Sequence, residues 1–213
     1  MPNWCENTIT IKGDKEKMKP IVDVLRELEA KETKDLTADI FVMESLLGTD
    51  DRPENYDSGG WYDYNVKKFG TKWDFKLIRD GGDYEIHDER ITLSVLTAWS
   101  PPQQFLITLC EKYDVQATIN YAEPGMDFTG SAEYGKDGCI TETQTSYMKG
   151  KYDNNDYFWE EVENVVYGYL DEVDALNKLK QYLSFLSPHE LEQVELIFNQ
   201  VKTQEEENAK KVE

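Results

Sequence analysis

Histidine and cysteine are scarce in this 213-residue chain, which has two histidines, His87 and His189, and three cysteines, Cys5, Cys110 and Cys139. Their spacing matches no zinc-binding pattern, so we expect no metal site. There is no Cys-x-x-Cys pair, and the cysteine number is odd. This excludes a disulfide framework and indicates a reducing compartment.

Long apolar runs are also lacking. No stretch approaches the ~18 apolar residues of a membrane span, and the N-terminus has no apolar signal region. The phosphate-binding and nucleophile motifs GxxxxGK[ST], GxGxxG and GxSxG are absent too. We therefore expect a cytoplasmic protein with no membrane partner and no cofactor, and the sequence does not support nucleotide or acyl-transfer chemistry.

Positive charge is in deficit: 43 acidic residues face 23 basic ones, for a formal net charge of −20. Residues 1–150 hold 28 acids and 17 bases, and residues 151–213 hold 15 and 6, so both parts are acidic. Such a field repels phosphates and anionic lipids, which disfavours direct nucleic-acid binding. It suits a partner protein with a basic groove, although solubility alone also accounts for it.

What the chain does contain is a run of alternating and helical patterns. Alternation predicts strands over residues 7–12, 73–77, 91–95, 115–121, 126–134 and 139–148. Helical spacing predicts helices starting near Lys17 or Lys19, over 61–69, and after a Ser100 N-cap. The order predicts an α+β fold of the ferredoxin-like split βαβ type, an antiparallel sheet with helices on one face, plus an extra β-hairpin.

The character of the chain changes after residue 150. We expect a ferredoxin-like domain over 1–150 and a C-terminal helical hairpin over 151–213, its second helix starting at the Ser187–Glu190 capping box. One face of that helix carries a stripe that is a possible interaction surface: Leu191, Val194, Phe198 and Val201. The stripe could instead be buried or join two copies into a homo-oligomer.

Four blocks occur in order: MPNWCENTITIKG, WYDYNVKKFGTKWDF, TLSVLTAWSPPQQFL and YAEPGMDFTGSAEY. Together they resemble the YubB-type ferredoxin-like domain family of plasmids, phages and prophages, over roughly residues 1–150. The resemblance implies a ferredoxin-like fold and a mobile-element origin. It implies no activity that can be transferred to this chain.

Seven residues in or next to these blocks are candidates for ligand or partner binding: Trp4, Asn7, Trp61, Asn65, Trp73, Trp99 and Glu123. One interpretation is structural, with the tryptophans gathered as apolar anchors at the sheet end and the asparagines satisfying backbone groups. Cys5 is equally expected to be structural, because it has no histidine partner and Glu6 would raise its pKa. The other interpretation is a ligand pocket.

Two functions remain open. The first is a non-enzymatic protein of a phage or other mobile element that binds a host protein through its acidic surface. The host protein would handle nucleic acids, and the chain would act as an anti-defence inhibitor or DNA mimic. The second is a small-molecule-binding protein or enzyme that uses the Trp/Asn cluster. A deep pocket with converging polar groups would favour the second, and a solid aromatic core would remove it.

Overall fold

The computed structural model describes residues 3–35, 37, 40–78, 81–154 and 157–212. The chain folds as two compact units, Met1–Thr145 and Ser146–Glu213. The two units have separate hydrophobic cores, so we treat each by itself.

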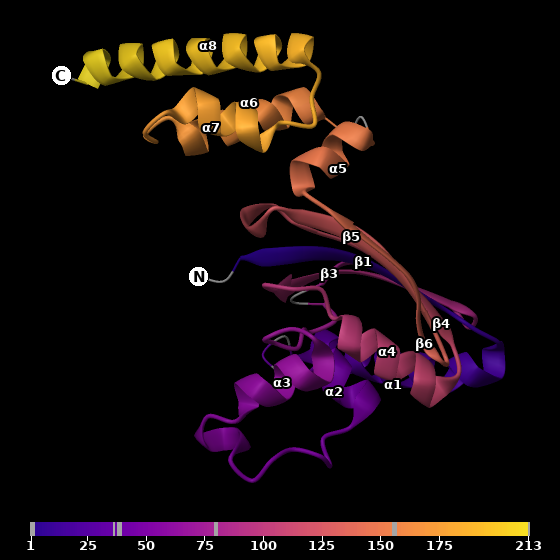
Figure 1. Ribbon diagram of the computed structural model, residues 1–213. Coiled ribbons are helices and arrows are strands. Elements are labelled where there is room, and N and C mark those ends of the chain that lie inside the picture. Colours follow the sequence, from indigo (N-terminus) through magenta and orange to yellow (C-terminus); the bar gives the residue numbers. More distant parts are fainter. Residues whose placement is uncertain (1–2, 36, 38–39, 79–80, 155–156, 213) are drawn as a thin grey trace. The chain divides into compact units, whose positions relative to one another are not determined.

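The described part of the first unit forms one antiparallel sheet of six strands in the order β2-β3-β1-β4-β5-β6. The strands are β1 (Trp4–Lys12), β2 (Gly81–Ile86), β3 (Arg90–Ala98), β4 (Gln116–Glu123), β5 (Phe128–Gly135) and β6 (Gly138–Thr145). The helices of this unit are α1 (Lys15–Lys34), α2 (Val42–Leu47), α3 (Trp61–Phe69) and α4 (Gln103–Tyr113). The α-helices of this unit lie on one face of the sheet (Figure 1). The β2-β3-β1-β4 order with α1 and α4 is the predicted ferredoxin-like arrangement, and β5 and β6 are the predicted extra hairpin.

Strand β1 forms because its residues alternate. Cys5, Asn7, Ile9 and Ile11 are buried against the helices, while the residues between them face the other side. Strand β1 is central in the sheet, because it pairs with β3 on one side and with β4 on the other. Ile9 lies opposite Leu93 and Ile119. This alternation was predicted from the sequence and is confirmed.

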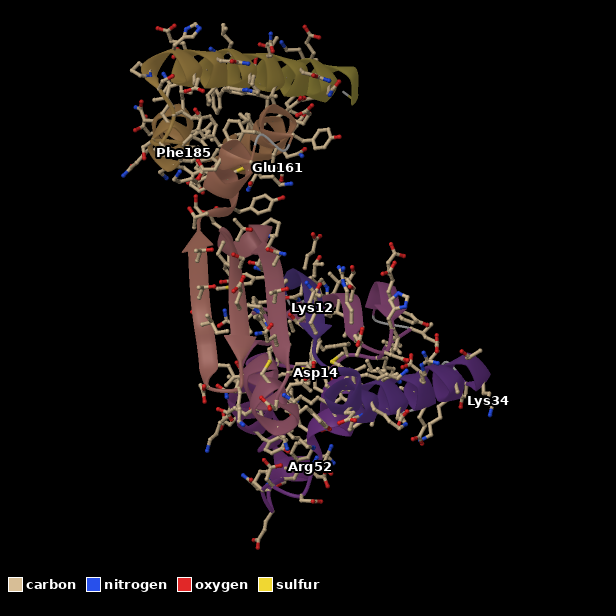
Figure 2. All side chains as sticks on the ribbon, turned by 90° about the vertical axis from the view of Figure 1, so that its right-hand side faces the viewer. Lys12, Asp14, Lys34, Arg52, Glu161 and Phe185 are labelled. Atoms are coloured by element: carbon tan, nitrogen blue, oxygen red, sulfur yellow. The ribbon has the colours of Figure 1, made fainter. Side chains whose placement is uncertain are left out.

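Helix α1 follows a two-residue turn and buries an apolar stripe that includes Met18, Ile21 and Leu25. It begins at Lys15, ahead of the predicted start at Lys17 or Lys19, so Pro20 lies inside the helix. Lys34 marks its far end (Figure 2).

The predicted strand over residues 73–77 is wrong, because β2 begins at Gly81. The backbone of the preceding segment bonds to other partners. Leu77 and Ile78 donate their N–H groups to the buried carboxylate of Glu32 (2.8 and 2.9 Å), and the Phe75 carbonyl accepts from Val42 (2.9 Å). These bonds hold the segment outside the sheet.

The predicted N-cap at Ser100 is also wrong. Helix α4 begins at Gln103, after Pro102, and the Ser100 hydroxyl instead donates to the Gly70 carbonyl (2.6 Å). Gly70 has a φ of 84° and ends α3, and a Cβ there would lie 3.1 Å from the Gln104 nitrogen. The end of α3 at Gly70 packs closely against the start of α4. The Ser100 hydroxyl therefore bonds to Gly70 and does not cap α4.

The described part of the second unit is helical. It contains α5 (Tyr147–Asp153), α6 (Phe158–Tyr169), α7 (Ala175–Tyr182) and α8 (Pro188–Val212), two helices more than the predicted hairpin. The capping box at the start of α8 is confirmed, because the Glu190 carboxylate accepts from the backbone N–H of Ser187 (2.8 Å) and the Ser187 hydroxyl accepts from the backbone N–H of Glu190 (3.4 Å).

The stripe proposed as an interaction surface on α8 lies in the core of this unit. Val194, Phe198 and Val201 are buried, and Leu191 packs against them. They pack in the same cluster as residues of α6 such as Val162 and Val166, whose four-residue spacing is typical of a helix. The stripe is therefore used within the unit and is not a free surface, which corrects the expectation from the sequence.

Candidate functional site

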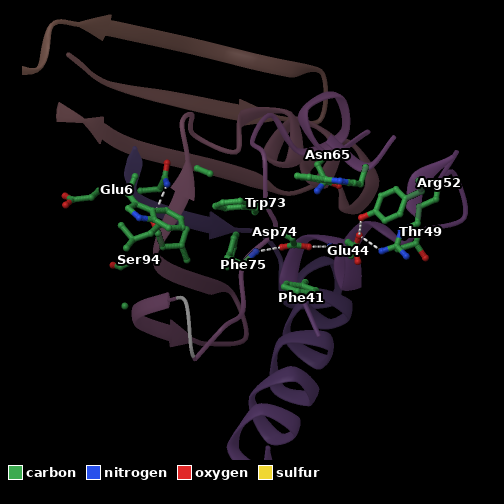
Figure 3. Close-up of a pocket in the computed structure, with 18 of the residues that line it drawn as sticks. Glu6, Phe41, Glu44, Thr49, Arg52, Asn65, Trp73, Asp74, Phe75 and Ser94 are labelled. Carbon is green, nitrogen blue, oxygen red and sulfur yellow. Dashed lines mark hydrogen bonds and ion pairs between the residues drawn. The ribbon is translucent and has the colours of Figure 1, made fainter. Parts of the chain in front are cut away.

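A cleft of about 1580 Å³ opens in the first unit beside the start of β1 and the end of β3 (Figure 3). One wall comes from these strands and the other from the segment that holds α2 and α3. Its lining includes five of the seven predicted residues: Trp4, Asn7, Trp61, Asn65 and Trp73. Trp99 and Glu123 are not part of the lining.

The aromatic rings at the cleft do not form a solid core. Trp4 and Trp73 are 46% and 37% exposed, and their ring centroids are 6.0 Å apart with the planes tilted by 46°. Trp4 is the first residue of β1, and Trp73 belongs to the segment held outside the sheet. The structural interpretation, in which these tryptophans are buried anchors, is therefore wrong for this pair, and their exposed ring surface lines the cleft.

Asn65 lies at the cleft and is 6% exposed. Its Nδ2 donates to the carbonyl of Lys72 (3.0 Å), directly before Trp73, so it satisfies a backbone group as predicted. Its Oδ1 is buried and has no hydrogen-bond partner among the described residues. Leaving an acceptor unsatisfied inside the protein costs free energy, so this buried atom lowers the stability of the fold at this position.

Two segments of the cleft wall are connected by a bond between Asp74, in the 71–78 segment, and the backbone of Glu44, in α2. The Asp74 carboxylate accepts from the backbone N–H groups of Met43 (2.9 Å), Glu44 (2.8 Å) and Phe75 (2.7 Å), which caps the start of α2. Burial raises the pKa of Asp74 to about 7, while these three donors act in the opposite direction.

Arg52 is the positive residue of the cleft lining. Its guanidinium lies 4.4 Å from the centroid of the Tyr56 ring and donates to Glu44 Oε1 (2.5 Å). Glu6, Glu44, Asp57 and Asp74 also line the cleft, so the lining holds four carboxyl groups and one cation. The site is therefore acidic and aromatic.

The sequence of the segment that supplies this wall has no clear helical or strand pattern. Residues 35–66 hold eight acidic residues and one basic residue, and this imbalance was the signal available. Glu44, Arg52, Tyr56 and Asp74 were missed as site residues. Their meeting depends on contacts between residues about thirty positions apart, such as Glu44 and Asp74.

The remaining candidates have structural roles. Asn7 Nδ2 lies within hydrogen-bond distance of the carbonyls of Cys5 (2.8 Å) and Val95 (3.1 Å), as expected. Glu123 is 2% exposed, and its carboxylate accepts from the backbone of Gly125 (3.1 Å), closing the 3₁₀ turn after β4. Trp99 turns the chain after β3 with a φ of 73°.

Nucleophilic and metal chemistry find little support. Burial, followed by the charge of Glu123, raises the pKa of the Cys5 thiol to about 12, so a thiolate is not formed near neutral pH. Within the described ranges, no group of three His, Cys, Asp or Glu side chains is placed to hold a metal ion. The same ranges contain no helix both long and apolar enough to cross a membrane.

The first unit thus defines a ferredoxin-like domain with an acidic, aromatic cleft beside its sheet. Residues 80–168 match a family model described as "Ferredoxin-like domain in Api92-like protein". The match covers less than half of the chain and supports a ferredoxin-like domain.

Among solved structures, the chain is similar to a crystal structure of a protein api92 from Yersinia pseudotuberculosis. The similarity has a TM-score of 0.44 and 10% sequence identity, and it covers 68% of this chain and 99% of that one. No curated protein matches this chain.

Proposed function

We propose that this protein is a non-enzymatic binding protein that takes a basic segment of a partner protein into the acidic cleft. The observation that supports this most is the composition of the cleft wall. Four carboxyl groups, those of Glu6, Glu44, Asp57 and Asp74, line the cleft against one cation, Arg52, and the exposed rings of Trp4 and Trp73 share the lining. Aromatic rings and carboxylates together attract cationic side chains.

The size of the cleft also supports a polypeptide ligand. Small-molecule sites occupy roughly 300–1,000 Å³. This cleft has about 1580 Å³ and is lined by residues of several elements (Figure 3). An extended segment of several residues fills such a groove better than a single small molecule does.

We further propose that the chain is a YubB-type protein of a phage, plasmid or prophage, and that its partner is a nucleic-acid-handling host protein. The four sequence blocks and the net charge of −20 support this proposal. A protein that binds nucleic acid presents basic side chains, and an acidic protein whose cleft takes up those side chains would act as an anti-defence inhibitor.

The alternative is a small-molecule ligand at the Trp/Asn cluster. The exposed rings of Trp4 and Trp73 support it, because a compact cationic or aromatic ligand can stack on them. Such a ligand would bind with little dependence on salt if its contacts were mainly aromatic, whereas a basic protein segment would dissociate as salt rises.

The test is affinity capture from a bacterial lysate with the full chain and with a Trp4→Ala/Trp73→Ala variant, washed at about 50 mM and about 500 mM salt. Tyr157→Ala is the matched control, because Tyr157 is 75% exposed and belongs to the second unit. A stoichiometric partner that the control retains, the cleft variant loses and high salt releases supports the proposal. Capture that is equal for all three proteins contradicts it.

A further inference from the structure

We propose that two copies of this chain associate through β6, so that their sheets join into one continuous sheet across a two-fold axis. This inference goes beyond the proposed function, and β6 contributes no residue to the cleft lining. Three observations lead to it. Strand β6 is an open edge of the sheet, it carries little charge, and its side chains complement those of a second copy in one antiparallel register.

Strand β6 is the last strand of the described sheet, so no described strand lies along its outer side. An edge strand presents backbone N–H and C=O groups that can bond to another strand. The six side chains from Cys139 to Gln144 are all exposed. Residues 141–145 pair regularly with β5, and the register shift lies nearer the hairpin turn, between Glu133 and Tyr134. Five regular residues are therefore available to a second strand.

The other edge of the described sheet is protected against such pairing. Strand β2 has six residues and a register shift, and it carries Asp83 and Glu85. Its Tyr84 hydroxyl donates to Glu29 of α1 (2.9 Å). Short length, irregular pairing and charge are the devices that keep edge strands apart. Strand β6 has eight residues, of which Glu142 alone is charged, and it contains no lysine, arginine or proline.

One antiparallel register gives favourable neighbours along the whole paired stretch. With the two-fold axis at Thr143, this residue lies opposite its own copy, and Thr141 lies opposite Thr145. Glu142 then lies opposite Gln144. Threonine pairs, and a carboxylate that accepts from an amide, stabilise adjacent strands. An axis at Glu142 would instead place two carboxylates opposite each other, which is destabilising, so the side chains select the first register.

Glu142 and Gln144 each have one polar atom bound within the chain and one left over. Gln103 of α4 donates to Glu142 Oε1 (2.8 Å), and the Tyr121 hydroxyl donates to Gln144 Oε1 (3.4 Å). Glu142 Oε2 remains as an acceptor and Gln144 Nε2 as a donor, without a partner among the described residues. In the register above, the donor of each copy meets the acceptor of the other on both sides of the axis.

The net charge of −20 determines how the association depends on salt. Two copies of an acidic chain repel each other, so the dimer is weak in dilute salt and tightens as salt screens the repulsion. A basic partner held in the acidic cleft has the opposite dependence, because its attraction is screened. The two associations are therefore distinguishable in the same buffers.

The experiment is sedimentation equilibrium of the full chain from about 10 µM to about 500 µM, in about 50 mM and about 300 mM NaCl. Thr143→Lys puts two positive charges opposite each other at the axis. Asn120→Lys is the matched control, because Asn120 is exposed on the same face of the sheet, in β4, and the substitution adds the same charge.

A second pair of variants tests the register. Gln144→Glu places a carboxylate opposite Glu142 of the other copy on both sides of the axis. Glu142→Lys/Gln144→Glu replaces both of these repulsions with ion pairs. If the register is correct, the double variant regains what the single variant loses.

We expect the mean molar mass of the unaltered chain to rise with concentration toward that of two chains, and to rise further at the higher salt. Thr143→Lys should weaken the dimer about fivefold even though it lowers the net charge, and Asn120→Lys should not weaken it. Gln144→Glu should weaken it about tenfold, since two like-charge pairs form. The double variant should associate at least as tightly as the unaltered chain.

A chain that stays monomeric up to about 500 µM in both salts would overturn the inference and would leave the β6 edge to a strand of a different protein. Equal weakening by Asn120→Lys and Thr143→Lys would also overturn it, because the contact would then lie on the face of the sheet. So would a double variant that associates no better than Gln144→Glu. The concentration series needs no variant, so it stands even if a substitution prevents folding.

Discussion

Asp74 shows how one side chain can carry two opposing influences. Burial raises its pKa to about 7 from 3.8, whereas its three backbone N–H donors favour the charged form. With a raised pKa, folding takes up a proton between about pH 4 and pH 7. The stability contributed by the protonated group is then present at low pH and lost as pH rises through 7.

We therefore predict that the free energy of unfolding of the unaltered chain falls, relative to Asp74→Asn, as pH rises from about 4 to about 7. The slope should not exceed about 1.4 kcal/mol per pH unit. Urea unfolding of both proteins at a series of pH values measures it. If the unaltered chain instead gains stability relative to Asp74→Asn as pH rises, the three N–H donors outweigh burial.

Gly130 of β5 is a second residue whose identity the fold requires. A Cβ at this position would lie 2.3 Å from the Thr143 carbonyl oxygen and 2.5 Å from the Tyr121 hydroxyl. We predict that Gly130→Ala lowers the free energy of unfolding by about 1–3 kcal/mol, as overpacking typically does. Gly82→Ala is the control, because its Cβ meets atoms no closer than 3.4 Å. Equal effects in chemical unfolding would refute the role of this contact.

Single residues were predictable where their role is local. Asn7 and Asn65 were expected to satisfy backbone groups at the borders of elements. Both do satisfy backbone groups, although Asn7 lies within β1 and Asn65 within α3. Glu44 and Asp74 were not identified as site residues, because their significance comes from a contact across thirty positions. That the buried Oδ1 of Asn65 lacks a hydrogen-bond partner is likewise known only once its neighbours are placed.

At the scale of elements, alternation predicted strands well except at residues 73–77. There the pattern Trp73, Phe75 and Leu77 is that of a strand, but the backbone donors of residues 77 and 78 are bound by Glu32 on α1. Phe75, Lys76 and Leu77 are all buried, so burial in this segment does not follow the alternation of the sequence. Period alone cannot distinguish a strand from an irregular connection whose hydrogen bonds go to side chains.

This gives an element-scale prediction. Glu32→Gln should loosen the segment before β2, because an amide oxygen accepts the Leu77 and Ile78 N–H groups less strongly than a carboxylate does. Amide hydrogen exchange at these two residues should accelerate about tenfold or more, while exchange in β1 stays unchanged. Glu27→Gln is the matched control, since Glu27 lies on the same helix and is 64% exposed in its pair with Lys31. Equal exchange in both variants would contradict the prediction.

At the scale of the whole molecule, the order of elements was sufficient for the ferredoxin-like sheet, since local patterns place β1 between β3 and β4 once the helices are assigned. The cleft was beyond reach, because it depends on where an irregular segment of some thirty residues folds back. The second unit was under-predicted for a related reason. Its α6 lies in an acidic, aromatic stretch whose apolar residues, Phe158, Val162 and Val166, reveal their shared face only in the folded core.

The net charge of −20 is a property of the whole chain and leads to the last prediction. Repulsion among like charges destabilises a compact state, and salt screens it, with a Debye length of about 10 Å at 0.1 M. We expect the Tm to rise by several degrees between about 10 mM and about 300 mM NaCl, since about 1 kcal/mol corresponds to about 2–4 °C for a chain of this size.

Magnesium chloride at equal ionic strength separates screening from specific binding. If screening dominates, the two salts raise the Tm along nearly the same curve, because no cluster of metal-ligating groups is present in the described part of the chain. A much larger rise with magnesium would instead place a cation among the acidic residues of segment 35–66, and its loss in Asp50→Asn/Asp57→Asn would locate it. A Tm that falls with sodium chloride would show that attractive pairs such as Lys15–Asp88 and Lys17–Asp114 outweigh the repulsion.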